Sequence, residues 1–497
     1  MKRPDKTTII ALGITALALG IRLYRLGSES LWVDEGFSLR DTYNLSVLHE
    51  TRPLFFLLMQ GWMKLIGNHS EFFLRLPAAL FGTASVWVLF KLGRRLMGDR
   101  TALLASFFMA LSVLQINHSR EIRMYTMTGL IALLATYVFI LAIDRKKPVY
   151  VVGYALLSLA GLLTSAVTAF ILAAHGVFLL LYLKAYRPIS YWLIAVQLIV
   201  VGAWYPWMKN NALAAGAYSE GYTSILDKPT PRGIVEFFGK FYIWKWSDPG
   251  KLFVLASLAF SFAVFILVLY SLKKIKRTDS ETVFTWLWVG VPMVSIIIVS
   301  YTIANMWMIH YLIASSPAVF LLTAKGINSL NSRKLAITAI SLITIVCLGR
   351  LGLYMGRHVR PEWKPAISYL EAHEMPGDVI GIFYGGYQYV FRYYYQGNTP
   401  WSPLGHDQVS SEQLRGWDEK KAAKLISSSP NTGKRFWLLL LSNNRGAGPS
   451  ITKHIASHYR VLDHKYYSQI ELILFDANGR TVPNRPARVA ASVKLAK

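Results

Sequence analysis

The chain has 497 residues, of which 54% are hydrophobic and only 16% are charged, whereas soluble globular proteins carry about 25% charged residues. This composition excludes an ordinary soluble enzyme, and the 13% share of aromatic residues is typical of membrane proteins with tryptophan and tyrosine at the lipid–water interfaces. The single cysteine, Cys347, excludes an intrachain disulfide framework and a cysteine-based zinc site.

Apolar runs recur along the chain at lengths close to the roughly 20 residues that cross a bilayer as a helix. They predict a polytopic α-helical membrane protein with about eleven transmembrane helices, and the division of residues 149–183 into two spans stays open. The predicted spans are residues 7–26, 74–92, 101–117, 125–143, 149–163, 166–183, 190–207, 251–272, 283–300, 310–324 and 335–354.

Basic residues gather at one side of these spans. They precede the first span and follow the second, fourth, sixth, eighth and tenth, and the positive-inside rule assigns that side to the cytoplasm. The net charge of +26 is therefore a topology signal and indicates no nucleic-acid partner. The clusters are Lys2, Arg3 and Lys6; Lys91, Arg94, Arg95 and Arg100; Arg145, Lys146 and Lys147; Lys184 and Arg187; Lys273, Lys274, Lys276 and Arg277; and Lys325, Arg333 and Lys334.

The same rule predicts which segments lie outside the inner (plasma) membrane. Residues 53–67 are apolar but short, which predicts an interfacial helix, because a span there would move the later basic loops outside. The predicted outer segments are 27–73, 117–124, 208–250 and everything after about Gly356.

The sequence changes character after the transmembrane domain, which we assign to residues 1–356. Helical and strand patterns alternate over residues 357–480, which predicts a small extracytoplasmic α/β domain. Residues 481–497 are basic and rich in small side chains, and we expect a disordered tail. The predicted elements of the α/β domain are helices at 361–378 and 411–429 and buried strands at 379–386 and 434–442.

Three predicted outer loops carry ionisable residues beside apolar segments, where charge is costly and is by default functional. The acidic pair in "SLWVDEGFSLR" has a plainer alternative, a cap for a helix beginning near Phe37. Glu121 also has one, a structural ion pair with Arg123 or Arg120. The ionisable residues of these loops are Asp34 and Glu35, Arg52 and Arg75, and Glu121 and Arg123.

Taken together, these motifs resemble glycosyltransferase family 39 and, more distantly, the protein O-mannosyltransferases and the lipid A aminoarabinose transferases. These groups share the GT-C membrane fold. The resemblance covers the first 145 residues well and is weaker in the middle spans. It rests on "LWVDEGFS", "RPLFFLLMQGWMKLIG", "EFFLRLPAALFGTASVWVLFKLGRRLMG" and "INHSREIRMY", and returns at "HYLIASSPAVFLLTAKGI" and "WKPAISYLEAHEMPGD".

The resemblance implies transfer of a sugar from a polyprenyl-phosphate donor to an acceptor glycan, lipid or protein on the outer face, with inversion. By this resemblance Asp34 is the base, Glu35 its neighbour with a metal or acceptor contact, and Glu121 a second acidic residue that orients acceptor or base. Arg75 is also a candidate brace for the acidic loop. The implied donor-phosphate residues are Arg52, Arg75, Arg123, His310 and Tyr311.

One position departs from the family pattern. Relatives often carry Arg-Tyr-Leu at the outer end of the tenth span, where this chain has His310, Tyr311 and Leu312. Histidine is mostly neutral at pH 7, whereas arginine is a fixed cationic fork, so we expect Arg52 to carry more of the phosphate contact or the phosphate to protonate His310. The sequence requires no cofactor and leaves a divalent cation open.

Two alternatives to this glycosyltransferase remain, a polyprenyl-linked oligosaccharide polymerase and a non-catalytic lipid-carrier transporter. A transporter is expected to have charges or broken helices near the middle of its spans. Here the spans are nearly free of charge in their interiors, apart from His175, which favours chemistry at the outer boundary. The sugar and the acceptor are not specified by the sequence.

Overall fold

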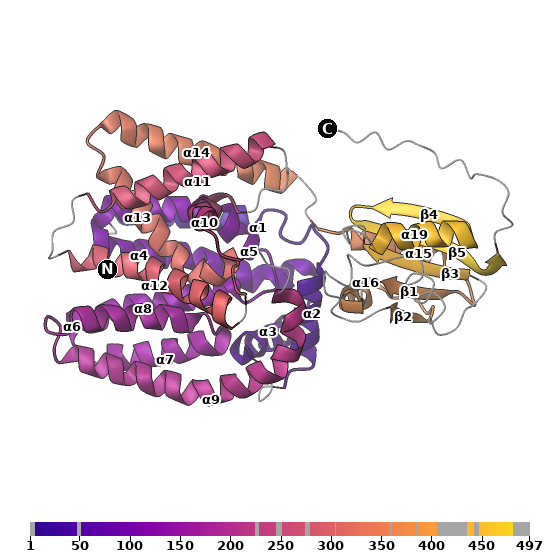
Figure 1. The fold of residues 1–497 in the computed structure, drawn as a ribbon, viewed down its shortest axis with the longest axis horizontal. Coiled ribbons are helices and arrows are strands. Elements are labelled where there is room, and N and C mark those ends of the chain that lie inside the picture. The colour runs from indigo at the N-terminus through magenta and orange to yellow at the C-terminus, as the bar shows by residue number, and fades with distance from the viewer. Residues whose placement is uncertain are drawn as a thin grey trace. The chain divides into compact units, whose positions relative to one another are not determined.

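The computed structural model describes residues 5–46, 51–223, 228–244, 251–273, 279–303, 305–356, 360–383, 385–404, 435–441 and 447–480. The chain divides into two compact units, Met1–Arg360 and Pro361–Lys497. The described part of the first unit is helical, and that of the second contains a β-sheet with helices (Figure 1).

Each predicted span overlaps at least one of the helical elements that make up the first unit. They are α1 (Lys6–Leu23), α2 (Val33–Tyr43), α3 (Pro53–Ile66), α4 (Glu71–Leu111), α5 (Val113–His118), α6 (Tyr125–Arg145), α7 (Pro148–Thr164), α8 (Thr168–Leu181), α9 (Ile189–Thr223), α10 (Pro231–Ile243), α11 (Lys251–Tyr270), α12 (Ser280–Thr302), the 3₁₀ helix η2 (Ile309–Ser315), α13 (Ser316–Asn328) and α14 (Arg333–Gly356).

Within the described residues, seven helices are long and apolar enough to cross a membrane. One of them, α4, has 41 residues, and a straight helix of that length would be about 60 Å long, twice the hydrocarbon core. Gly98 interrupts it with φ 78° and ψ 171°, a conformation that glycine adopts without steric cost. The break falls between the predicted spans 74–92 and 101–117. The polytopic helical fold is therefore confirmed, and the number of membrane crossings stays a prediction.

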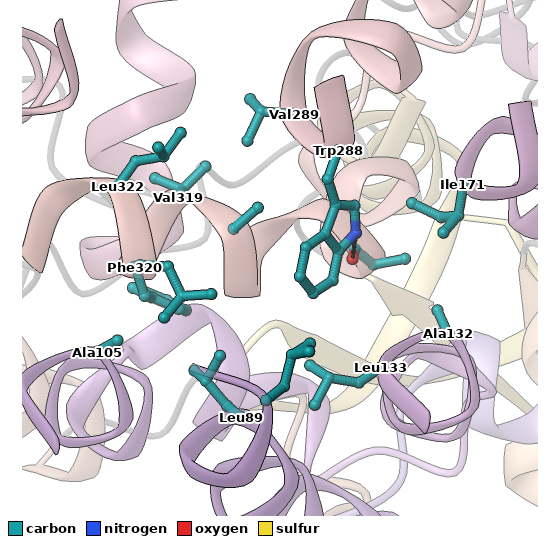
Figure 2. Packing of buried hydrophobic residues seen from close by; sticks show 14 of the residues in the cluster. Leu89, Ala105, Ala132, Leu133, Ile171, Trp288, Val289, Val319, Phe320 and Leu322 are labelled. Atoms are coloured by element: carbon teal, nitrogen blue, oxygen red, sulfur yellow. Dashed lines mark hydrogen bonds between the residues drawn. The ribbon is translucent and has the colours of Figure 1, made fainter. Parts of the chain in front are cut away.

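The main core of the first unit surrounds Trp288 of α12, which is fully buried. Figure 2 shows this indole among aliphatic side chains from α4, α6, α8 and α13. Its Nε1 donates a hydrogen bond of 3.1 Å to the carbonyl oxygen of Ala314 in η2. The core thus anchors the 3₁₀ segment that begins at Ile309 and carries His310 and Tyr311.

His175, the polar residue expected inside a span, lies in a satisfied network between helices α6, α7 and α8. Its ring nitrogens lie 2.9 Å from the hydroxyl of Tyr154 and 3.2 Å from Oγ1 of Thr136. Gln197 of α9 donates to the same tyrosine hydroxyl at 2.8 Å. Such hydrogen bonds hold apolar helices together in a bilayer, so this histidine has a structural explanation.

Ion pairs join several of the predicted cytoplasmic ends to one another. Arg94, near the Gly98 break, pairs with Asp5 before α1 at 2.7 Å. Arg95 pairs with Asp144 at the end of α6 at 2.5 Å. These contacts place the start of α1, the middle of α4 and the end of α6 at one end of the helical unit. That this end faces the cytoplasm stays a prediction.

The second unit contains a five-stranded sheet in the order β2-β1-β3-β5-β4. Strand β1 is parallel to β2 and β3, whereas β5 is antiparallel to both β3 and β4. Ile451 and Ile455 of α19 pack in one buried cluster with alternate residues of β3. The elements are α15 (Trp363–His373), β1 (Val379–Phe383), η3 (Gly385–Tyr387), α16 (Gln388–Tyr394), β2 (Trp401–Leu404), β3 (Arg435–Leu441), α19 (Ala447–His458), β4 (Tyr459–Tyr467) and β5 (Ile470–Arg480).

The helix predicted at 361–378 is present as α15, and the two predicted strands as β1 and β3. The sequence did not predict β2 or the hairpin of β4 and β5. The helix predicted at 411–429, the tail 481–497 and part of the loop 208–250 lie outside the described residues.

Candidate active site

The acidic pair opens helix α2. Asp34 and Glu35 lie in its first turn, where unpaired backbone N–H groups and the helix dipole favour negative charge. A carboxylate oxygen of Glu35 accepts a 3.2 Å hydrogen bond from the backbone N–H of Trp32, which is a capping contact. Glu35 therefore caps α2, but this helix begins at Val33 and not near Phe37 as the helix-cap alternative expected.

Glu35 is also the centre of a buried ion network. Its side chain is fully buried, and Arg75 donates to its two oxygens at 2.8 and 2.9 Å. Arg360 forms a second ion pair with it, and the backbone N–H of Ile122 donates at 3.1 Å. Burial acts to raise the pKa of Glu35, but Arg360 and Arg75 outweigh it and hold the pKa below its ordinary value.

Arg75 has a structural role in this arrangement. Besides Glu35, its guanidinium donates to the backbone carbonyl oxygens of Leu26, Glu29 and Ser30 at 3.1, 2.8 and 3.1 Å. Its side chain is 1% exposed. These contacts favour bracing of the acidic loop over direct contact with a phosphate. They also occupy the Glu35 oxygens that a metal or an acceptor would need.

Asp34 has a different environment from its neighbour. Its side chain is 34% exposed, and Oδ2 lies 3.9 Å from Nη2 of Arg123. The surrounding protein desolvates the carboxyl and raises its pKa, and Arg123 only partly offsets this effect. Asp34 is therefore both reachable from solvent and more basic than an ordinary aspartate, as a general base requires.

Two arginines lie near this carboxylate. Arg123 sits over the ring of Tyr125, with 5.7 Å between its guanidinium carbon and the ring centroid. Arg52 stacks similarly on Phe56 at 5.5 Å, and both exert attractive charge on Asp34. Stacking fixes the guanidinium planes and leaves their N–H edges for hydrogen bonding.

Glu121 is buried beside a histidine. Its oxygens lie 2.7 Å from Nδ2 of Asn117 and 3.1 Å from Nδ1 of His118, and Arg360 approaches to 3.9 Å. Burial acts to raise the pKa of Glu121, but His118 and Arg360 hold it below its ordinary value. The partners of Glu121 are thus His118, Asn117 and Arg360, in place of the Arg123 or Arg120 pair considered from the sequence.

Aromatic rings connect this acidic residue to η2. The ring of His118 lies 4.6 Å from that of Tyr125 and 6.2 Å from that of His310, between centroids. His310 in turn lies 4.8 Å from Tyr125. Tyr311 lies within electrostatic range of Arg123, Arg52 and Asp34. The structure therefore brings all eight residues expected at the site to one end of the helical unit.

Arg22 of helix α1 contacts the start of the loop that carries Glu121 and Arg123. Arg22, fully buried, donates through Nε to Oγ of Ser119 at 3.1 Å. Gly82 of α4 makes room for this contact, because a Cβ at that position would collide with the Ser119 hydroxyl. Arg120 donates to the backbone carbonyl oxygens of Tyr24 and Arg25 just beyond α1.

Sequence analysis missed three contributors. Arg360 is assigned to the second domain by the sequence, yet it groups with the first unit and contacts Glu35 and Glu121. No periodicity marks a lone arginine after a helix, so no sequence signal was available. His118 and Asn117 stand within the "INHSREIRMY" motif, three and four residues before Glu121, a spacing at which side chains on one turn meet.

No group of three or more metal-ligating side chains occurs among the residues that the structure describes. Histidine and carboxylate side chains do meet in the Glu121–His118 pair.

Comparison with known proteins bears on this site. Residues 50–207 match the family model of dolichyl-phosphate-mannose-protein mannosyltransferases, a range that includes Arg52, Arg75 and the Glu121 loop but not Asp34. ArnT from Cupriavidus metallidurans in the apo state superposes with a TM-score of 0.56 at 13% identity, covering 95% of this chain and 98% of ArnT. The chain has the GT-C fold.

Other GT-C structures superpose comparably. ArnT bound to undecaprenyl phosphate gives a TM-score of 0.55 at 12% identity over 95% of this chain and 98% of ArnT. The oligosaccharyltransferase AglB of Archaeoglobus fulgidus, in complex with an inhibitory peptide and a dolichol-phosphate, gives 0.52 at 12% identity over 93% of this chain and 74% of AglB. The resemblance to GT-C membrane glycosyltransferases drawn from the sequence is confirmed.

A relative by sequence is an uncharacterized protein of Aquifex aeolicus strain VF5. It is 24% identical over 347 residues, which are 67% of this chain. The chain spans 66% of that relative's length. The match adds no activity to the argument.

Proposed function

We propose that this GT-C protein transfers a sugar from a polyprenyl-phosphate donor to an acceptor hydroxyl at the outer face of the inner membrane, with inversion of the anomeric centre. The observation that carries this proposal is Asp34, a partly exposed carboxylate with a raised pKa beside Arg123. A base and a cation lie together, as a displacement with a phosphate leaving group requires.

Asp34 supplies the proton acceptor in this proposal. The acceptor hydroxyl loses its proton to the carboxylate as its oxygen attacks the sugar carbon. Glu35 is unsuited to that task, because Arg75 and Arg360 occupy its oxygens and hold its pKa low. A single attack by the acceptor oxygen, from the side opposite the phosphate, inverts the anomeric centre without a covalent glycosyl-enzyme intermediate.

Arg52 and Arg123 supply the phosphate contacts. Charge-assisted hydrogen bonds from guanidinium groups suit phosphate oxygens, and both arginines lie within electrostatic reach of Asp34. The relatives support this chemistry, since ArnT has been solved with undecaprenyl phosphate and AglB with a dolichol-phosphate and a peptide. Arg75 remains a brace in this proposal.

The membrane side follows from charge. The Arg94–Asp5 and Arg95–Asp144 pairs gather basic residues at one end, and the positive-inside rule makes that end cytoplasmic. Asp34 follows α1 at the end of that helix opposite to Asp5. The site therefore belongs to the outer face, where a lipid donor stays anchored while its sugar meets the acceptor.

A transfer assay tests the proposal. Purified protein in detergent or nanodiscs is incubated with radiolabelled hexosyl and pentosyl phosphoundecaprenols and with extracts of envelope lipid, glycan and protein. We expect label to move from one donor to one acceptor class and undecaprenyl phosphate to be released. Growth of a chain of repeats would indicate the polymerase. Binding of every donor with no release would indicate a transporter.

A further inference from the structure

The two ring nitrogens of His118 have different surroundings. Nδ1 lies 3.1 Å from a carboxylate oxygen of Glu121. Nε2 is buried and has no hydrogen-bond partner among the described residues, and the residue is 5% exposed. Buried polar atoms are normally hydrogen-bonded, so an exception is a candidate ligand contact.

Glu121 determines what this histidine can offer. An ionised carboxylate only accepts hydrogen bonds, so Nδ1 carries the hydrogen of that contact. A phosphate oxygen also only accepts hydrogen bonds here, so a histidine that bridges Glu121 and a phosphate donates from both ring nitrogens. Asn117 at 2.7 Å and Arg360 at 3.9 Å hold the carboxylate in place from its other oxygen. His118 therefore has Nδ1 held by Glu121 and Nε2 left to contact a ligand.

His118 and Arg123 pack on the same tyrosine. The His118 ring packs on Tyr125 at 4.6 Å between centroids, and Arg123 covers the same tyrosine at 5.7 Å. His310 borders the histidine at 6.2 Å. A buried histidine nitrogen beside an arginine and aromatic rings is a suitable contact for an anion.

We propose that His118, positioned by Glu121, contacts the substrate through Nε2–H and hydrogen-bonds the phosphate of the polyprenyl-phosphate donor. This inference rests on the proposed function. The bond between the sugar carbon and the phosphate oxygen breaks, the acceptor oxygen bonds to that carbon, and the acceptor proton passes to Asp34. The phosphate leaves with the electron pair, and the N–H donor stabilises the charge that it gains. Glu121 is then a positioning residue.

Two substitutions separate this role from a structural one. The amide nitrogen of asparagine reaches the place of Nδ1, whereas that of glutamine reaches the place of Nε2. His118→Asn should keep the Glu121 contact and lose the phosphate contact, and His118→Gln should do the reverse. The readouts are the KM for donor, the KM for acceptor, and inhibition by undecaprenyl phosphate. His69→Asn and His69→Gln, at an exposed histidine, are the matched controls.

The proposal expects His118→Asn to raise the donor KM and the inhibition constant of undecaprenyl phosphate about 10- to 100-fold, the usual effect of losing a hydrogen bond to a charged group. His118→Gln should change them less, and neither variant should change the acceptor KM. Equal or greater loss in His118→Gln would overturn the proposal and leave the histidine as a support for Glu121.

A second measurement covers variants that are poorly active or unstable. The thermal shift that undecaprenyl phosphate produces in the wild type should shrink in His118→Asn and in Glu121→Gln. A full shift in both would also overturn the proposal. The proposed function fails separately, if the wild type transfers no sugar from any phosphoundecaprenol.

Discussion

Asp34 and Glu35 are adjacent on the first turn of one helix, yet their carboxyl groups have opposite environments. Burial dominates at Asp34 and raises its pKa, whereas Arg360 and Arg75 overcome burial at Glu35 and lower its pKa. Neighbouring carboxyls whose pKa values are pushed apart commonly have separate tasks in a site. Here one is suited to accept a proton and the other to hold the loop.

Asp34→Asn should abolish most transfer without unfolding the protein. Loss of a general base typically costs about 10²–10⁴ in rate. When folding raises the pKa of a carboxyl, the free energy of unfolding falls as pH rises from the unfolded pKa through the folded pKa. The asparagine variant should therefore melt no lower than wild type at neutral pH. Initial rates and thermal melts on the same preparation check both statements. Wild-type transfer by this variant would exclude Asp34 as the base.

The pH profile should follow the ionisation of Asp34. The base works only when deprotonated, so kcat/KM should rise with pH through the raised pKa of this group. Arg123 acts to lower that pKa. Arg123→Gln should therefore move the acid limb of the profile to higher pH, besides weakening donor binding. An unmoved acid limb would show that another group controls it.

Arg52→Ala should impair donor use more than acceptor use. It removes a cation from the place proposed for the phosphate, and a charge-assisted hydrogen bond is worth about 1.5–3 kcal/mol, so the donor KM should rise tenfold or more. Arg52→Lys should retain part of the contact. Arg232→Ala removes an arginine that is 62% exposed and serves as the control. A normal donor KM in Arg52→Ala would assign this residue to structure alone.

Glu35→Gln should act on stability first. It leaves Arg75 and Arg360 without their common carboxylate, and breaking a buried ion pair costs about 3–5 kcal/mol. Because folding lowers the pKa of Glu35, its contribution is present above the unfolded pKa and is lost as pH falls through the folded one. Melting temperatures across acid pH measure this. Glu236→Gln, at a more exposed pair, should cost less than about 1 kcal/mol.

Topology can be checked with a reporter that is active on only one side of the membrane. Fusion of an alkaline phosphatase after Gly356 should give an active enzyme, since this position is predicted outside. Fusion after Lys146, in a predicted basic inner loop, should give an inactive one. The reverse pattern would invert both the topology and the location of the site.

Much of this molecule follows from hydrophobic pattern alone. Long apolar runs predict membrane helices because backbone groups in lipid must be satisfied within the segment, and β1 and β3 were recognised as buried strands. Strand β4 was not recognised, because all nine of its residues are partly or fully exposed and charged residues interrupt the alternation. Strand β4 joins the sheet through backbone hydrogen bonds to β5. Such backbone pairing is not visible in the order of side chains.

The acidic residues were found by their place in loops, but their division of labour was not. Glu35 acquires its role from Arg360, which lies 325 residues away. Glu121 acquires its role from His118, whose spacing was visible but whose buried Nε2 was not. Sequence shows which groups occur near a membrane boundary, whereas their partners depend on tertiary packing.

The contacts of Arg360 matter for any attempt to cut this protein into parts. A helical fragment ending at Gly356, where the hydrophobic pattern stops, would keep every apolar helix of the described first unit and lose one of the two cations that neutralise Glu35. A fragment ending four residues later would keep both. Other domains grafted onto the first unit should therefore be joined after Arg360, since a junction at Gly356 would leave Glu35 without one of its two arginine partners.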